Sequence, residues 1–224
     1  MPEQLLNLGC GHVTPDGWIN VDGSNRAWLA SKFPWIDRAL VSMKLIPTSE
    51  FSRATTFADL RKRFLWPDAS IDGIYMGELL EHFTKEQGEN IIDKCFRVLK
   101  PNGILRIRVP DHANFWRNYV SQYAATKEKP REQWNDEHTR WTKMHFGDIC
   151  VRKPGRLASF GHFHKWMYDD ISLILLLESV GFQSVERMAF HDSRLARIED
   201  IEVRDDLIVE AVKPQLSDVD EFAL

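Results

Sequence analysis

The chain is poor in features that mark several large classes of protein. It has three cysteines, Cys10, Cys95 and Cys150, none in a CxxC pair, and their odd number argues against a disulfide framework. The longest apolar run, residues 171–177, is too short to span a bilayer. The first residues lack the basic and apolar regions of a signal peptide, so we expect a cytoplasmic protein.

An excess of positive charge is also missing. The chain has 29 Lys and Arg against 33 Asp and Glu, a net charge of −4, which disfavours a protein built mainly to coat nucleic acid. Its 224 residues are 43% hydrophobic and 28% charged, as in ordinary globular domains. We therefore expect one domain over residues 1–213, followed by an acidic tail at residues 214–224.

Short apolar runs alternate with segments of helical periodicity. The pattern predicts helices at residues 24–35, 84–99 and 169–180. It predicts strands at residues 5–8, 18–22, 71–76, 104–109, 182–190 and 206–212. This alternation is typical of an α/β protein with a mostly parallel sheet. The last two strands have no helix between them, so we expect an antiparallel hairpin at one edge.

Residues 111–167 differ from the rest of the chain because they are weakly periodic. Between residues 112 and 166 there are ten Lys and Arg against five Asp and Glu, a local charge of +5, and four of the eight tryptophans. Aromatic and cationic groups together suit stacking on sugars or bases and contacts with phosphate or carboxylate. The tryptophans could equally form the core of a helical subdomain. We predict a lid here, with these acceptor-binding candidates: Trp116, Arg152, Arg156, His162 and His164.

Two local patterns stand where the first two strands are expected to end. The first strand runs into Gly9-Cys10-Gly11 and leads towards a helix, an arrangement that lets a ligand approach the backbone closely. Thr14 stands where the dinucleotide fingerprint requires glycine, which disfavours a nicotinamide enzyme. Asp22 ends the second strand, where a carboxylate could accept both hydroxyls of a ribose or cap a helix.

Further motifs follow these two in a fixed order. The segments are LNLGCG, VD, ADL, GELLEH and VLKPNGILRIRVPD. This order resembles the class I S-adenosylmethionine-dependent methyltransferases, over residues 4–111 and again over 168–213. It is most similar to small methyltransferases associated with glycan biosynthesis. The resemblance implies a Rossmann-like, seven-stranded sheet with an antiparallel last strand and an insertion after the fifth strand.

The resemblance also implies which residues would bind the cofactor, S-adenosylmethionine. The glycine loop would line its methionine part, Asp22 would hold the ribose, Asp59 and Leu60 would meet the adenine, and Glu78 would lie near the methyl group. Many members carry an acid where this chain has Asn7, which brings no charge to the cofactor's ammonium group. The cofactor-binding candidates are therefore Asn7, Gly9, Cys10, Gly11, Asp22, Asp59, Leu60 and Glu78.

A hydroxyl acceptor would need a base, and Glu78 and His82 are the candidates. At i and i+4 they would share one helix face, and histidine titrates near neutral pH, although His82 could instead make a structural hydrogen bond. His162 and His164 alternate, with other histidines nearby, but no metal-ligand spacing is diagnostic. Because methyl transfer does not require a metal, we expect none.

We therefore expect a methyltransferase that moves a methyl group to an oxygen or nitrogen by direct displacement. The favoured acceptor is a small molecule or a sugar or sugar-phosphate of a glycan, which could be anionic. One alternative is a nucleic-acid methyltransferase, but the chain has MGEL where base methyltransferases often have (N/D)PP(Y/F). Another is a non-enzymatic S-adenosylmethionine-binding partner of a glycosyltransferase. Little chain precedes the first strand, so cover for the cofactor would come from residues 111–167 or from a second subunit, as in a homodimer.

Overall fold

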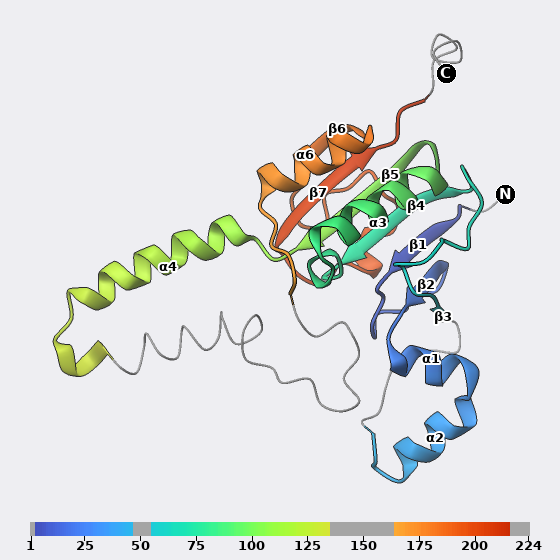
Figure 1. The fold of residues 1–224 in the computed structure, drawn as a ribbon, viewed down its shortest axis with the longest axis horizontal. Helices are drawn as coiled ribbons and strands as arrows, with labels where there is room; N and C mark the ends of the chain where they lie inside the picture. The colour runs from blue at the N-terminus through green and yellow to red at the C-terminus, as the bar shows by residue number, and fades with distance from the viewer. Residues whose placement is uncertain (1–2, 47–54, 135–163, 216–224) are drawn as a thin grey trace.

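The computed structural model describes residues 3–46, 55–134 and 164–215, and its centre is a seven-stranded sheet (Figure 1). The strands are β1 (Leu5–Leu8), β2 (Trp18–Asp22), β3 (Thr56–Phe57), β4 (Ile71–Gly77), β5 (Leu99–Val109), β6 (Gln183–Arg187) and β7 (Leu207–Val212). Their order is β3-β2-β1-β4-β5-β7-β6, and β7 alone runs antiparallel to its neighbours. The predicted fold class is confirmed. The expected antiparallel pair of the last two strands at one edge is also confirmed, with β7 next to β5 and β6 outermost.

Four of the five described α-helices, all but α2, begin after a residue whose side chain accepts from an N–H group of the first turn. They are α1 (Asn25–Lys32), α2 (Pro34–Ser42), α3 (Lys85–Val98), α4 (His112–Lys127) and α6 (Asp170–Val180), with 3-10 turns η1 (Leu80–His82), η2 (Arg131–Gln133) and η3 (Ile198–Asp200). Ser24 caps α1, and Thr84 with Gln87 forms a capping box on α3. The single helix expected at residues 24–35 is two helices, because Pro34 starts a new one at its first position.

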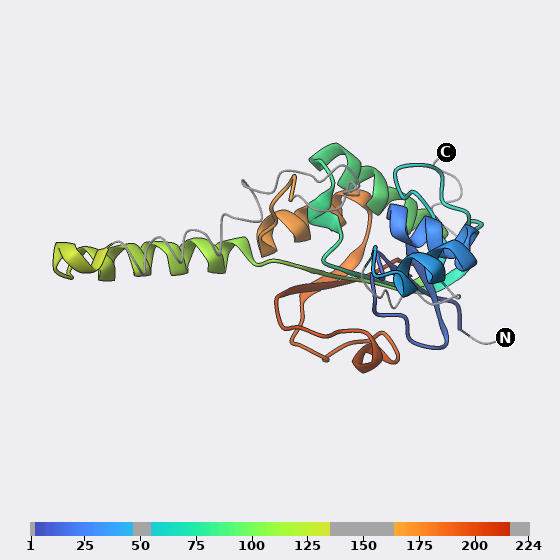
Figure 2. The same ribbon diagram turned by 90° about the horizontal axis from the view of Figure 1, so that it is seen from below.

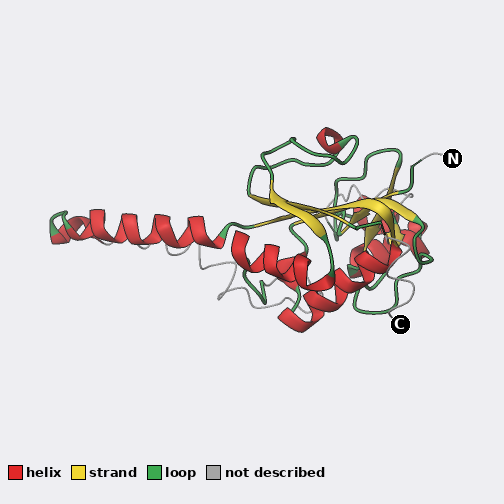
Figure 3. Ribbon diagram, turned by 90° about the horizontal axis from the view of Figure 1, so that it is seen from above, coloured by secondary structure: helices red, strands yellow, loops and turns green. Residues whose placement is uncertain are grey.

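The two faces of the sheet are covered differently (Figures 2 and 3). Helices α3 and α6 pack on one face, over the larger apolar core, in which Ile91, Ile92 and Leu173 are fully buried. The long connection between β6 and β7, which includes η3, covers the other face. There a second core joins Leu195 and Ile198 of this connection to residues of β1, β2 and β4.

Arg106 of β5 attaches this connection to the sheet. Its Nε and Nη2 donate to the two carboxylate oxygens of Glu202, at 2.9 and 2.7 Å. Its remaining N–H groups reach Glu210 and the carbonyl oxygens of Asp192 and Ala189. All five donors of a guanidinium group are therefore used, although the Arg106 side chain is fully buried.

The connection between β1 and β2 contains no helix, and none of the predicted helices falls there. Residues 9–17 return directly to β2, which pairs in parallel with β1 so that Asn7 lies beside Asn20. The Nδ2 of Asn7 donates to Asn20 Oδ1 at 2.9 Å and to the carbonyl of Val13 at 2.8 Å. The Nδ2 of Asn20 in turn donates to the carbonyl of Pro15. Two buried amides thus hold a turn where a crossover helix is usual.

Helix α4 leaves the carboxyl end of β5 and extends away from the sheet (Figures 1 and 2). Thr126 is its one buried residue. The chain is described again from His164, where the backbone N–H of Lys165 donates to the carbonyl of Glu81 at 2.7 Å. The end of the expected lid therefore lies at the sheet, while closure over a cofactor stays a prediction. Among the described residues, no helix combines the length and apolarity that crossing a membrane requires.

Candidate functional site

The glycine loop lies at the carboxyl end of β1 and has room for a ligand. Gly9 and Gly11 have φ angles of +71° and +52°, which side-chain-bearing residues rarely adopt. The N–H groups of Gly9 and Cys10 donate to the carbonyl of Val21, which fixes the loop against β2. A Cβ at Gly9 would lie 2.7 Å from the Leu79 side chain, whereas a Cβ at Gly11 would meet no atom within 4 Å. A ligand can therefore approach the backbone at Gly11.

Asp22 stands beside this open space. Its Oδ2 accepts from the N–H of Gly11 at 3.1 Å, and its Oδ1 accepts from the N–H of Ser24 at 2.7 Å. The residue is 9% exposed. Each carboxylate oxygen has a second lone pair, so Asp22 can accept hydrogen bonds from a ligand's hydroxyls as well. Asp22 thus connects the glycine loop to the start of α1.

Asp59 and Leu60 follow β3, next to β2. The N–H of Ala58 donates to the carbonyl of Asp22, which brings this segment to the site. The Asp59 carboxylate accepts two bonds of 2.8 Å from the Arg61 guanidinium, which hold the pKa of Asp59 below its usual range. Leu60 is 5% exposed and belongs to the larger core. The adenine contacts implied for both residues stay predictions.

Cys10 is a buried thiol within the glycine loop. Burial, and then the nearby Asp22 carboxylate, raise the pKa of Cys10 to about 12. Cys10 is therefore a neutral thiol near pH 7, not a nucleophile. Its place between the two loop glycines suits a packing role under a bound ligand.

Glu78 follows directly after β4 and lies in the left-handed region, with φ of +51°. Its Oε1 accepts from Arg108 Nη1 at 3.2 Å and from Arg204 Nη1 at 3.1 Å. Arg108 also donates to the hydroxyl of Tyr75. The expectation that Glu78 and His82 share a helix face is wrong, because η1 begins only at Leu80 and its three residues form a 3-10 turn. The arginine partners of Glu78 were not predicted, although Arg106 and Arg108 alternate in an otherwise apolar strand.

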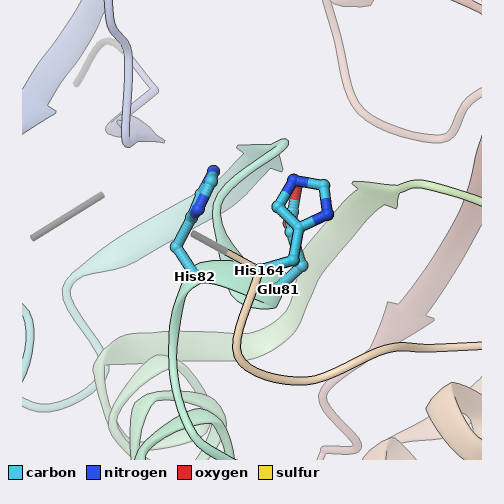
Figure 4. Close-up of side chains that lie close together, drawn as sticks. All are labelled: Glu81, His82 and His164. Carbon is cyan, nitrogen blue, oxygen red and sulfur yellow. The ribbon is translucent and has the colours of Figure 1, made fainter. Parts of the chain in front are cut away.

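Glu81, His82 and His164 form the second group of polar side chains near the end of β4 (Figure 4). One ligand atom from each lies within 4.8 Å of the others. The rings of His82 and His164 meet edge to face, with centroids 5.0 Å apart. Glu81 is 2% exposed, and within the described part of the chain neither of its carboxylate oxygens has a hydrogen-bond partner. Burial raises the pKa of Glu81 to about 8.

Two further buried polar atoms lie around this group. The hydroxyl of Tyr168 and the Nδ1 of His112 also lack hydrogen-bond partners. Burial, and then the nearby His164, lower the pKa of His112, while burial followed by Glu81 raises that of Tyr168. His112 is thus close enough to His164, and Tyr168 to Glu81, for their charges to interact. Unsatisfied polar atoms are thus concentrated here, where native structures usually have few.

The predicted acceptor residues are placed only in part. His164 joins Glu81 and His82, as described above. Trp116 lies on α4 with 47% of its surface exposed. Arg152, Arg156 and His162 lie outside the described residues. The role of each in acceptor binding stays a prediction.

Comparisons with known proteins agree on one class. Residues 43–107 match the family model of a methyltransferase domain. A stretch of 134 residues, 59% of the chain, is 23% identical to a probable S-adenosylmethionine-dependent methyltransferase of Mycolicibacterium smegmatis and covers 37% of that protein. The chain thus spans well under half the length of this curated relative.

A comparison with solved structures concerns the fold of the chain. An S-adenosylmethionine-dependent methyltransferase of Methanosarcina mazei has a TM-score of 0.51 at 17% identity, covering 96% of this chain and 95% of that one. One from Archaeoglobus fulgidus has a TM-score of 0.49 at 16% identity, covering 94% and 86%. The Methanosarcina structure shows a shared fold. The family model and the curated relative are likewise of methyltransferases, and that relative's name makes it dependent on S-adenosylmethionine.

Proposed function

We propose that this protein transfers a methyl group from S-adenosylmethionine to a sugar or sugar-phosphate acceptor of a glycan. The observation that carries the cofactor part is Asp22, a carboxylate at the end of β2 that is hydrogen-bonded to Gly11 beside open space. When bound, S-adenosylmethionine supplies a methyl group on an electrophilic sulfonium. The protein's task is then alignment of the acceptor and, for a hydroxyl, removal of its proton.

The residues present fit this cofactor, although not all of them would contact it directly. Asp22 would accept from the ribose hydroxyls, and the Gly9–Gly11 loop would let the methionine part approach the backbone. Asp59 can reach an adenine amino group only by sharing its carboxylate with Arg61. Asn7 uses both Nδ2 hydrogens within the β1–β2 turn, so it supports the loop's shape.

The acceptor part rests on composition. The charge of +5 and the four tryptophans over residues 112–166 suit an anionic, ring-shaped acceptor. Glu78 would have to break its hydrogen bonds to two guanidinium groups before it could accept a proton. It is therefore better suited to positioning the acceptor than to acting as the base. His82 is then the better of the two predicted bases. The net charge of −4 and the MGEL segment disfavour a nucleic-acid acceptor.

Substitution of Asp22 tests the cofactor site. Asp22→Ala should weaken S-adenosylmethionine binding about ten- to a hundredfold in calorimetry, because hydrogen bonds to a charged group contribute about 1.5–3 kcal/mol. Asp16→Ala, at an exposed position of the nearby β1–β2 turn, is the matched control and should bind as the wild type does. Circular dichroism confirms that each variant is folded. Unchanged affinity in folded Asp22→Ala would remove this assignment.

Labelled transfer tests the acceptor. The purified protein is incubated with methyl-labelled S-adenosylmethionine and, separately, with sugar phosphates, nucleotide sugars, oligosaccharides, RNA and DNA. We expect label in a sugar-containing product. Label in RNA or DNA alone would favour the nucleic-acid alternative. Tight cofactor binding with no transfer to any acceptor would favour the non-enzymatic partner of a glycosyltransferase.

A further inference from the structure

Glu81 is a buried carboxyl group for which the fold provides no partner. Removing a carboxylate from water is costly unless it is paired, hydrogen-bonded or bound to a metal. Among the described residues, both carboxylate oxygens of Glu81 lack a hydrogen-bond partner. Yet two imidazole rings stand next to it, from His82 and His164. A cation bound here would satisfy the carboxylate of Glu81, and the two adjacent imidazoles could serve as further ligands.

We propose that Glu81, His82 and His164 bind a divalent transition-metal ion, with Zn²⁺ as the best match. Two histidines and one carboxylate are a common ligand set of catalytic zinc sites, which keep a fourth position open. The same set also suits Fe²⁺ and other first-row ions, whereas Mg²⁺ and Ca²⁺ prefer oxygen ligands. This proposal reverses the expectation that the protein needs no metal.

The geometry requires only a small adjustment. Ligand atoms at about 2.0–2.2 Å from a tetrahedral ion lie roughly 3.3–3.6 Å from one another. The ligand atoms here lie within 4.8 Å of one another, so side-chain rotations that move each atom by about 1 Å would complete the site. Figure 4 shows the three side chains extending into one space from two segments of chain.

The backbone holds those two segments together. Glu81 and His82 are neighbours in η1, immediately beyond β4. His164 arrives from a segment more than eighty residues later, and the next two N–H groups, of Lys165 and Trp166, donate to the carbonyl of Glu81. The carbonyl of Glu81 therefore fixes the place of His164, while its carboxylate stays available. Such a preformed arrangement lowers the cost of binding an ion.

A metal bound here would act on the methyl acceptor. This role of the metal rests on the proposed methyl transfer. An acceptor hydroxyl on the open position would lose its proton more readily, because a bound cation lowers the pKa of a coordinated oxygen. The proton passes to solvent, the oxygen forms its bond to the methyl carbon, and the carbon–sulfur bond breaks with its electron pair left on sulfur. His82 would then be a metal ligand rather than the base.

The test measures metal binding directly on the full chain. Protein treated with EDTA and dialysed is titrated with Zn²⁺ in a calorimeter, and protein as purified is assayed for metals by mass spectrometry. We expect one Zn²⁺ per wild-type chain and at least tenfold weaker binding in Glu81→Gln. Glu86→Gln, which removes an exposed carboxylate in the first turn of α3, is the matched control and should bind as the wild type does.

Each outcome decides the proposal. A wild type that binds no Zn²⁺, or a folded Glu81→Gln that binds it equally well, overturns the site; His82→Ala supplies a second variant if Glu81→Gln does not fold. S-adenosylmethionine binding and methyl transfer are measured separately on the same samples. Intact transfer after metal removal refutes the metal's role alone. Zn²⁺ binding without cofactor binding refutes the proposed function and leaves the metal site standing.

Discussion

Arg106 and Glu81 are both buried ionisable residues, yet their surroundings are opposite. Arg106, at the centre of β5, has a partner for every N–H group. Glu81, one turn beyond β4, has none for either oxygen. Folding alone therefore completes the first group, whereas the second stays incomplete until something binds. A buried polar group with all partners present is part of the scaffold, and one without them marks a place for a ligand.

The largest effect on stability is expected when Arg106 is replaced. Arg106→Met leaves two buried carboxylates, Glu202 and Glu210, without their central cation. We expect the free energy of unfolding to fall by about 3–5 kcal/mol in urea titrations, since breaking a buried ion pair strands the other charge. Arg194→Met is the control, because Arg194 also pairs with Glu210 but is 35% exposed, and its loss should be smaller. Equal losses would contradict a special role for Arg106.

The paired amides of the β1–β2 turn should give an intermediate effect. Asn7→Asp replaces two donated hydrogen bonds with a carboxylate facing the carbonyl of Val13 and Oδ1 of Asn20. Stranded buried acceptors cost about 1–3 kcal/mol, so we expect a loss of that size in thermal or urea unfolding. Asn118→Asp, on the exposed side of α4, should change stability by less than about 0.5 kcal/mol. A stable Asn7→Asp would show that the turn does not depend on these amides.

The smallest change, with the opposite sign, is expected at Glu81. In metal-free protein, Glu81→Met should stabilise the fold by about 1 kcal/mol, because it removes a buried carboxyl whose two oxygens lack hydrogen-bond partners. Glu178→Met, at an exposed position of α6, is the reference. Excess Zn²⁺ should reverse the order, since an ion at a hundred times its dissociation constant adds about 2.7 kcal/mol to the wild type alone. A clear loss of stability in metal-free Glu81→Met would mean that Glu81 does have a partner.

Six of the seven strands could be located from local patterns, whereas the seven-stranded sheet with an antiparallel last strand was implied only by the family resemblance. Apolar runs, capping residues and glycine positions recur along the chain, and the motif order matched a known family. The broken helix at Pro34 was visible in the sequence as well, since proline favours the first position of a helix. The structure therefore contains most of the features that local sequence patterns indicate.

Features that depend on distant segments could not be predicted. The turn without a helix depends on Asn7 and Asn20 becoming neighbours, which the register of two strands decides. The burial of Glu81 depends on the return of the chain near His164. Neither pairing leaves a periodic signal. The cofactor contacts of Asp22, Asp59 and Glu78 stay predictions for a related reason. The position of a side chain does not by itself identify the ligand that it binds.

The short β1–β2 turn also has a consequence for how the chain reaches its fold. The β1–β2 pairing joins Leu5 to Trp18, whereas the β1–β4 pairing joins Leu5 to Gly73. Closing the longer loop costs about 1.5 kcal/mol more in chain entropy by the logarithmic dependence on loop length. Strands β1 and β2 are thus a local unit that can form early, before the central strands assemble. The part of the site that contains the glycine loop and Asp22 would then precede, in folding, the part that contains Glu81.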